Sequence, residues 1–491
     1  MLKMQILKGT SWLLAGRLVS NALGLLSTLI AARLLMPEDF GLMAIAMSVF
    51  GIAGAVVELP VGAALVQMKD AKKADFDTAW TINVLRGAIV AALMLLAAWP
   101  ASLISGDPRL LALVAALAAY PLLLSLRNSW FEQYIREMDF RREALIDVIT
   151  KVTSIAVTVW VGLATRSYWA LPAGLIASGL ANTAASYLLR PQLPAFALSS
   201  FRKFFGFSVW IGLGNIADNL RDASTTLLLG RFLGNAKLGA FAVGSQFGER
   251  LELVLYAPME RTLFAAFSSI QDDAVRVRAV YLKSIHSCFA IIAPVCAGMC
   301  LLAPEIIGLA LGPNWSVAAV VLAFVAPITA VYLLAGLGNS LTNALGQPRE
   351  LFKFKALSAG LHVPLLAAGV AAGGLAGALA ACALTALGWY AFSIHVVAKL
   401  TGISMRAQMA AVARSTGATL VMGAVVMWAR AGLIAGEAGS VLQMIVQAGG
   451  LATLGAVTYS AAHLTLWQLS GRRAGIEQTA FSFLSRRLAN P

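Results

Sequence analysis

Charge is scarce in this sequence. Only 12% of the 491 residues are Asp, Glu, Lys or Arg, whereas 59% are hydrophobic and the mean hydropathy is +0.80. A soluble globular domain carries about 25% charged residues, so the composition excludes that class and indicates a membrane protein. Histidine is scarcer still. The four histidines, which lie near predicted helix ends and to which we assign no role, are His286, His362, His395 and His463.

Cysteine is equally rare. All four cysteines, Cys288, Cys296, Cys300 and Cys382, fall within apolar stretches. Cys296 and Cys300 share a helix face, but they lack the two further ligands of a tetrahedral metal site. We therefore predict that the cysteines are small packing residues, and that the protein has no metal site and no cofactor.

Long hydrophilic segments are missing as well. The longest polar connections, near 127–142 and 263–280, are too short to fold into a catalytic domain, and the other connections are shorter. The apolar runs do not alternate with polar residues in ten-residue pieces, which excludes a transmembrane β-barrel. The first apolar run is too long for the core of a signal peptide, so we expect it to be retained.

What the sequence does contain is a series of about fourteen apolar runs, most of about 20–28 residues. Such a run spans roughly 30 Å of hydrocarbon as a helix. The sequence thus predicts an all-α polytopic membrane protein. The expected helices are near 10–34, 41–66, 79–103, 110–128, 142–164, 168–190, 205–229, 236–262, 279–303, 315–345, 352–372, 373–399, 408–433 and 441–468.

The net charge of +14 is distributed unevenly along these helices. If the N-terminus lies inside, most Lys and Arg fall in cytoplasmic segments. The opposite-side connections hold only Arg109, Arg166, Arg231, Lys237 and Arg430. This asymmetry follows the positive-inside rule, so we expect both termini in the cytoplasm. It also accounts for the basic balance without nucleic acid, which we exclude as a partner.

An internal repeat divides the chain. At an offset of 198 residues, Trp12 aligns with Trp210, Asn21 with Asn219 and Pro60 with Pro258, without a gap. Six helices per repeat make the two repeats parallel, related by an axis along the membrane normal. We predict an N-lobe at 1–190, a linker at 191–204, a C-lobe at 205–400, two additional helices at 401–470 and a basic cytoplasmic tail at 471–491.

Several polar residues lie inside the helices of the second repeat. Asp218, Arg221 and Asp222 occupy positions i, i+3 and i+4 and share one face, which Asn215 and Asn219 extend. The next helix carries Glu249, Arg250 and Glu252. Each charge would cost about 3 kcal/mol at mid-bilayer, so these groups face protein or water. Two interpretations stay open: the arginines bridge the acids as structural contacts, or the excess of acids binds H⁺ or Na⁺ for coupling.

The first repeat has the opposite bias. Arg17 and Asn21 lie inside the first predicted helix, Glu58 precedes Pro60 in the second, and Arg86 lies inside the third. Because a guanidinium binds phosphate with two parallel hydrogen bonds, these arginines suit a diphosphate.

Proline interrupts the second helix of each repeat. Pro60 and Pro258 each remove a backbone donor at equivalent depth. Each is either a hinge or a static bend.

Several segments resemble one known family. They are Met36–Ala46 (MPEDFGLMAIA), Ala64–Lys73 (ALVQMKDAKK), Arg136–Ala144 (REMDFRREA), Gly230–Ala242 (GRFLGNAKLGAFA) and Asn343–Arg349 (NALGQPR). In order and spacing they are similar to the polysaccharide-exporter, Wzx-type flippases of the multidrug/oligosaccharidyl-lipid/polysaccharide superfamily. The resemblance covers nearly the whole chain. It implies two six-helix lobes around a central cavity that opens alternately to each membrane face.

The resemblance also implies a substrate, an undecaprenyl-diphosphate that carries an oligosaccharide repeat unit. It places the protein in the bacterial inner membrane, among membrane lipids, and beside a polysaccharide polymerase and glycosyltransferases. Its product would serve exopolysaccharide, capsule or O-antigen synthesis. Three alternatives remain: a lipid II flippase, a multidrug/cation antiporter of the same fold, and a membrane glycan polymerase. The polymerase is disfavoured because it would need a sizeable outer loop.

Overall fold

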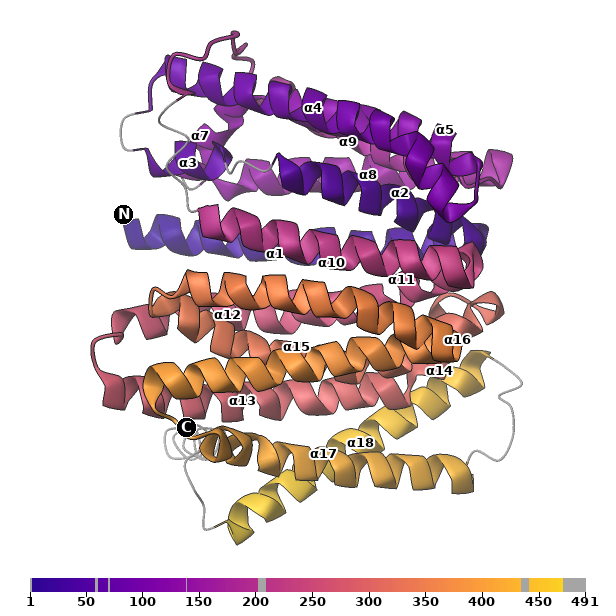
Figure 1. Ribbon diagram of the computed structural model, residues 1–491, viewed down its shortest axis with the longest axis vertical. Helices are drawn as coiled ribbons and strands as arrows, with labels where there is room; N and C mark the ends of the chain where they lie inside the picture. Colours follow the sequence, from indigo (N-terminus) through magenta and orange to yellow (C-terminus); the bar gives the residue numbers. More distant parts are fainter. Residues whose placement is uncertain are drawn as a thin grey trace. The chain divides into compact units, whose positions relative to one another are not determined.

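The computed structural model describes residues 2–57, 61–68, 71–137, 139–201, 209–433 and 441–470. Inside these ranges the side chains of some helical residues, Arg17 and Asn215 among them, are outside the description. All regular elements of the described residues are helices, without a strand, which confirms the all-α fold (Figure 1). The chain forms two compact units, Met1–Gly239 and Ala240–Pro491.

The first unit contains the helices of the first repeat and the first helix of the second. Its elements are α1 (Leu2–Leu34), α2 (Pro37–Val56), α3 (Val61–Gln67), α4 (Lys73–Ser105), α5 (Arg109–Leu117), α6 (Ala119–Ser125), η1 (Ser129–Phe131), α7 (Glu132–Arg136), α8 (Phe140–Thr165), α9 (Ala170–Leu189), α10 (Val209–Leu233) and the start of α11 (Asn235–Leu251). Helix α8 packs against α1 and α9, α4 against α5 and α6, and α10 against α2.

Local sequence determines where several helices begin. The Asp39 carboxylate accepts a hydrogen bond from the Met36 amide at 2.9 Å at the start of α2. Asp75 does the same for the Lys72 amide at the start of α4, also at 2.9 Å. These carboxylates satisfy backbone donors that a helix start leaves unpaired, and they interact favourably with the helix dipole. Helix α4 ends at Ser105 and is capped by Gly106, whose φ of 73° favours glycine.

The segment after α9, predicted as a linker, is bound to α4. Its backbone amides at Ala195, Ala197 and Ser200 donate to Asp77 Oδ1, Thr81 Oγ1 and Thr78 Oγ1 at 3.1, 3.0 and 3.3 Å. The three acceptors are all buried. The polar first turns of α4 therefore bind the linker backbone, which explains why an apolar protein keeps an aspartate and two threonines there.

The second unit continues the series of helices. Its elements are the π-helix η3 (Glu252–Tyr256), α12 (Ala257–Ser269), α13 (Ala274–Leu301), α14 (Ala303–Ala310), η4 (Pro313–Trp315), α15 (Ser316–Ala344), α16 (Pro348–Thr401), α17 (Met405–Leu433) and α18 (Val441–Leu469). Helix α16 is two helices joined at Gly373 and Gly374, where Gly374 has a φ of 56°. The break coincides with the boundary predicted between 352–372 and 373–399.

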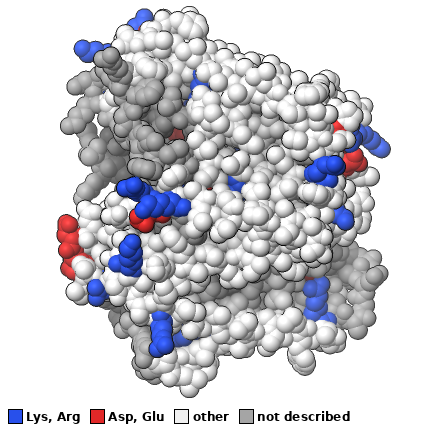
Figure 2. All heavy atoms as spheres, in the orientation of Figure 1, with Lys and Arg blue, Asp and Glu red and all other residues white. Residues whose placement is uncertain are grey.

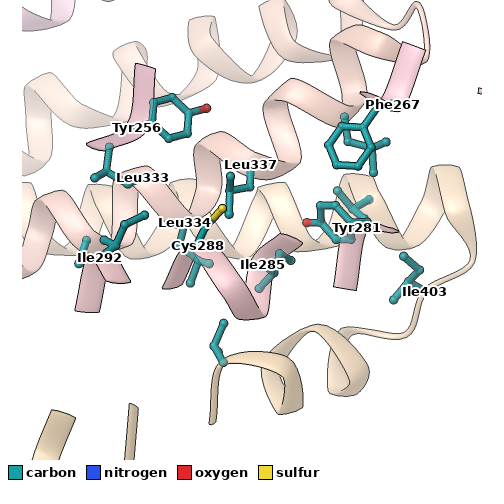
Figure 3. Close-up of a cluster of buried hydrophobic side chains, with 14 of the residues drawn as sticks. Tyr256, Phe267, Tyr281, Ile285, Cys288, Ile292, Leu333, Leu334, Leu337 and Ile403 are labelled. Atoms are coloured by element: carbon teal, nitrogen blue, oxygen red, sulfur yellow. The ribbon is translucent and has the colours of Figure 1, made fainter. Parts of the chain in front are cut away.

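Aromatic and aliphatic side chains fill the core of the second unit (Figure 3). Tyr281 is buried there beside Phe267, and its hydroxyl donates to Gln408 Oε1 of α17 at 3.3 Å. The Gln408 amide in turn donates to the Ile394 carbonyl of α16 at 3.0 Å. The start of α17 is thereby fixed to both α13 and α16.

Eight helices among the described residues are long and apolar enough to span a membrane, or nine if the bent pair Arg109–Ser125 and Ser129–Arg136 forms one span. In that count α16 is a single span. Each of the fourteen predicted segments overlaps helical structure. Some match a whole helix, some match part of a longer helix, and some match several short helices in series. The predicted number of fourteen membrane helices is therefore consistent with the structure. On the face drawn in Figure 2, charged residues lie mainly toward the ends of the helices. The protein is a multi-pass membrane protein.

Candidate functional site

The polar face predicted on residues 215–222 lies on α10. Arg221 pairs with Asp222, with Nη2 3.0 Å and Nε 3.1 Å from Oδ1. Asp218 and Asn219 are half-buried, and Asn219 Oδ1 lies against Gly51 of α2. Asn215 belongs to α10, but its side chain is not among those described. The face is therefore turned partly toward α2, within the first unit.

The two arginines predicted to bind diphosphate lie on different helices. Arg86 is half-buried on α4, about 20 Å along the helix from Lys73. The next residue, Gly87, packs so closely on Ser125 of α6 that a Cβ would collide with that side chain. Arg17 is on α1, with its side chain outside the description, and Asn21 is half-buried on the same helix. A joint role for Arg17 and Arg86 stays a prediction.

The remaining acids belong to the second unit. Glu249 and Glu252 are exposed and Arg250 is half-buried. Asp218 and Asp222 belong to the first unit. The four carboxylates that we expect to bind a cation are thus divided, two in each unit, and their joint role stays a prediction.

Both repeats interrupt their second helix beside the proline. Glu252–Tyr256 forms the π-helix η3, directly before Pro258 in the first turn of α12. At the equivalent place in the first repeat, α2 ends at Val56 and α3 begins at Val61. Glu58 and Pro60 themselves lie outside the described residues. The π-helix beside Pro258 is an irregular backbone segment next to a residue that lacks a backbone donor. The hinge role of Pro60 and Pro258 stays a prediction.

Sequence reasoning missed a polar cluster at the predicted outer ends of the helices. The Arg109 guanidinium donates to Asp107 at 3.1 and 2.8 Å and pairs with Glu38 of α2. Asn235, the first residue of α11, donates to Asp107 Oδ2 at 2.8 Å. The hydrogen bonds from Arg109 hold the pKa of Asp107 below its usual range. In the sequence, only Asp107, two residues before Arg109, signals this cluster.

Next to this cluster the two repeats meet at equivalent positions. A Cβ at Gly41 would collide with the Asn235 carbonyl, and one at Gly239 would collide with the Pro37 carbonyl. Gly41 and Pro37 align with Gly239 and Asn235 at the 198-residue offset. The contact is therefore reciprocal, as a two-fold relation between parallel repeats requires.

A second missed cluster involves histidine. His286 lies in the middle of α13 rather than near a helix end, and it contacts Arg414 of α17 and His463 of α18. The sequence could not indicate these contacts, because the three residues come from distant segments.

The second unit also has a cavity of about 480 Å³ between α14 and α15. Apart from Ser316 its lining is apolar, and it includes Ile307, Val320 and Phe324. None of the predicted site residues lines it. We therefore do not include this cavity in the candidate functional site.

Known proteins share the sequence and the fold of this chain. It is 24% identical over 390 residues to the lipopolysaccharide biosynthesis protein WzxC of Escherichia coli (strain K12), covering 77% of each chain. It is 24% identical over 326 residues to the succinoglycan biosynthesis transport protein ExoT of Rhizobium meliloti (strain 1021), covering 65% of each. The structure of the lipid II flippase MurJ in an inward closed conformation superposes with a TM-score of 0.74 at 12% identity, over 92% of this chain and 98% of that one.

The superposition shows that the chain has the fold of a membrane transporter. Residues 30–320, more than half of the chain, match the family described as polysaccharide biosynthesis protein. The chain belongs to the polysaccharide biosynthesis protein family.

Proposed function

We propose that the protein is a flippase for lipid-linked glycan. It moves undecaprenyl-diphosphate-linked oligosaccharide repeat units from the cytoplasmic to the outer leaflet by alternating access. The observation that carries this proposal is the combination of a transporter fold over nearly the whole chain with membership of a polysaccharide biosynthesis family. Neither a polymer-holding outer domain nor a catalytic domain is needed for this activity, so we propose no enzymatic function.

The charges in the first unit support a phosphate-bearing substrate. Arg86 is half-buried within α4, in a helix long and apolar enough to span the membrane. An intramembrane arginine is costly unless it faces protein, water or a ligand. We assign the diphosphate to Arg86 together with Arg17.

The carboxylates support cation coupling. Asp218, Asp222, Glu249 and Glu252 outnumber Arg221 and Arg250, and we propose that H⁺ or Na⁺ bound there resets the transporter. Pro60 and Pro258 are the proposed hinges, since both second helices are interrupted beside them. Vesicles with imposed cation gradients provide the test. A double variant, Asp218→Asn with Glu249→Gln, that responds to the gradient like the wild type would exclude this coupling role.

The proposed location is the bacterial cytoplasmic membrane, with both termini inside. The polar cluster of Arg109, Asp107 and Glu38 joins the start of α2 to the connection between α4 and α5. The positive-inside rule predicts both segments on the outer side, and the cluster supports their lying on one and the same side. Reporter fusions that place the C-terminus outside would contradict it. The proposed partners are membrane lipids, the glycosyltransferases that build the repeat unit and the polymerase that consumes it.

Sequence relatives favour a polysaccharide precursor over lipid II or a drug. WzxC and ExoT are named for polysaccharide biosynthesis, whereas the likeness to MurJ at 12% identity concerns the fold alone. A chromosomal deletion tests the choice. We expect loss of one surface polysaccharide and accumulation of its lipid-linked repeat unit in the inner leaflet, with peptidoglycan synthesis unaffected. Lysis with accumulated lipid II would instead support the lipid II alternative.

A further inference from the structure

Three helices of the second unit bring together a buried group that the proposed transport site does not use. His286 is on α13, Arg414 on α17, and His463 and Tyr459 on α18. Helices α17 and α18 have no counterpart in the predicted repeats. His286 and His463 are 4% and 6% exposed, so both imidazoles are removed from solvent. Buried ionisable side chains within spanning helices are rare and most often serve function.

The hydrogen bonds of His286 define its protonation state. Its Nδ1 is 3.0 Å from the Ala411 carbonyl, which only accepts, so Nδ1 carries the proton. Its Nε2 is 3.0 Å from Arg414 Nη2, which only donates, so Nε2 presents its lone pair. His286 is therefore neutral in this structure, with its proton on Nδ1.

The rest of the group holds His286 in place. The His463 ring stacks on His286 with centroids 6.0 Å apart, and Tyr459 stacks on His463 at 5.3 Å. The Tyr459 hydroxyl donates to the Ala290 carbonyl of α13 at 2.7 Å, one turn after His286. The α13–α18 contact therefore fixes the imidazole, while Arg414 reaches it from α17.

The charged residues on the helices around His286 make this site sensitive to protonation of the imidazole. Helices α13, α15, α17 and α18 contain no Asp or Glu. The nearest other charged residues on the same helices are Lys283 of α13 and Arg406 of α17, both cations. On the other elements that pack on α13, Glu305 of α14 pairs with Arg430 and His362 of α16 bonds to Thr385. Glu260 of α12 interacts electrostatically with Arg261 and Lys355, and Tyr390 of α16 packs against the core cluster of Tyr281. A second positive charge on His286 would therefore face Arg414 directly.

We propose that His286 is a proton-binding site of the second unit, at which a proton and the Arg414 guanidinium compete for Nε2. Because Nε2 has one lone pair, binding a proton removes the acceptor of Arg414 and places two cations side by side. Proton uptake then weakens the contact between α17 and α13 at Arg414, and movement of Arg414 away from His286 favours proton uptake, since linkage is reciprocal. Histidine suits this role because its unperturbed pKa lies near neutrality.

Nitrogen NMR of the full-length protein in lipid nanodiscs tests the site without any substrate. In protein labelled with ¹⁵N-histidine and assigned with His286→Gln, we expect His286 at high pH to show a protonated Nδ1 and an unprotonated Nε2. On acidification from about pH 9 to about pH 5, Nε2 should gain a proton. In Arg414→Gln the titration should move to higher pH, whereas in the control Arg406→Gln, an exposed arginine on the same helix, it should not move.

A proton on Nε2 at high pH, or a His286 that stays neutral throughout this interval, would overturn the proposal. So would a titration that is unaffected by Arg414→Gln. If the Arg414→Gln protein does not assemble, the proposal is still decided by the tautomer of His286 in the wild type and by the titration of His286 in Arg414→Lys. The lysine keeps a positive charge that competes with the proton.

A second measurement rests on the proposed function. We expect the flipping rate of reconstituted wild type to change across the pH interval in which His286 titrates, and His286→Gln to lose that change. His395→Gln, which replaces an exposed histidine of α16, should keep it. A His286→Gln variant with the wild-type pH profile would refute a role in transport. If no variant flips the glycan, the proposed function fails, while the NMR titration still decides the proton site.

Discussion

At the scale of single residues, the sequence shows which positions carry charge inside helices but not which groups pair. Arg221 and Asp222 are neighbours in sequence, so their ion pair could be anticipated. The bond between Arg414 and His286 could not, because it joins residues 128 positions apart. Partners of this kind depend on how helices pack, which periodicity within one helix does not specify.

Arg86 provides the most direct residue-scale test of substrate binding. Hydrogen bonds to a charged group contribute about 1.5–3 kcal/mol. We therefore expect Arg86→Gln to slow glycan flipping roughly tenfold to a hundredfold at unchanged protein level. The matched control is Arg33→Gln, an exposed arginine in the last turn of α1, which should flip at the wild-type rate. Equal rates for both variants would remove Arg86 from the site.

Asp107 gives a prediction about pH. Its pKa is lowered by hydrogen bonds from Arg109, so the ionised form stabilises the fold above the pKa of the unfolded chain, near 4. This stabilisation is lost as the pH falls through the lower, folded value. Because Arg109 is 41% exposed, we expect Asp107→Asn to lower stability at neutral pH by only about 1 kcal/mol.

Thermal unfolding of purified protein between pH 3 and 7 checks this expectation. The difference between Asp107→Asn and wild type should shrink toward the acid end of the range. Asp139→Asn is the control, because the Asp139–Arg142 pair is longer, at 3.5 Å, and both side chains are more exposed. A constant difference at all pH values would mean that the ionised carboxylate does not stabilise the fold.

At the scale of elements, the apolar runs predicted nearly every helix, and Gly373–Gly374 marked the break inside α16. The docking of the linker on α4 was not predictable. Pro191 and Pro194 indicate a connection, but its amides bond to side chains 116 to 122 residues away. Short-range patterns report helix formation and breaking, whereas these bonds depend on tertiary structure.

The reciprocal glycine contact is testable by substitution. Gly41→Ala and Gly239→Ala each place a Cβ against a backbone carbonyl, and overpacking of this kind costs about 1–3 kcal/mol. Gly54→Ala lies in the same helix as Gly41 with nothing within 4 Å, so it should be neutral or slightly stabilising. Melting temperatures in detergent would distinguish them. If all three variants melt alike, the two repeats do not approach each other as the structure shows.

At the scale of the whole molecule, the 198-residue repeat and the charge asymmetry predicted parallel repeats in a multi-pass membrane protein. The all-α transporter fold, with a TM-score of 0.74 to a lipid II flippase structure, agrees with the membrane-protein prediction, whereas the parallel relation of the repeats stays a prediction. The repeat and the composition are properties of the whole chain, so they predict architecture well. They do not predict which charged residues meet, because most charged residues of one repeat align with uncharged residues of the other.

Flipping in reconstituted vesicles tests the central claim most directly. Purified protein is placed in vesicles with an undecaprenyl-diphosphate-linked oligosaccharide repeat unit, and the outward movement of the glycan is followed with a reagent that reacts only outside. We predict protein-dependent movement that Arg86→Gln slows and Arg33→Gln preserves. Movement no faster than in protein-free vesicles, while lipid II or a cationic dye crosses with the protein, would contradict the account.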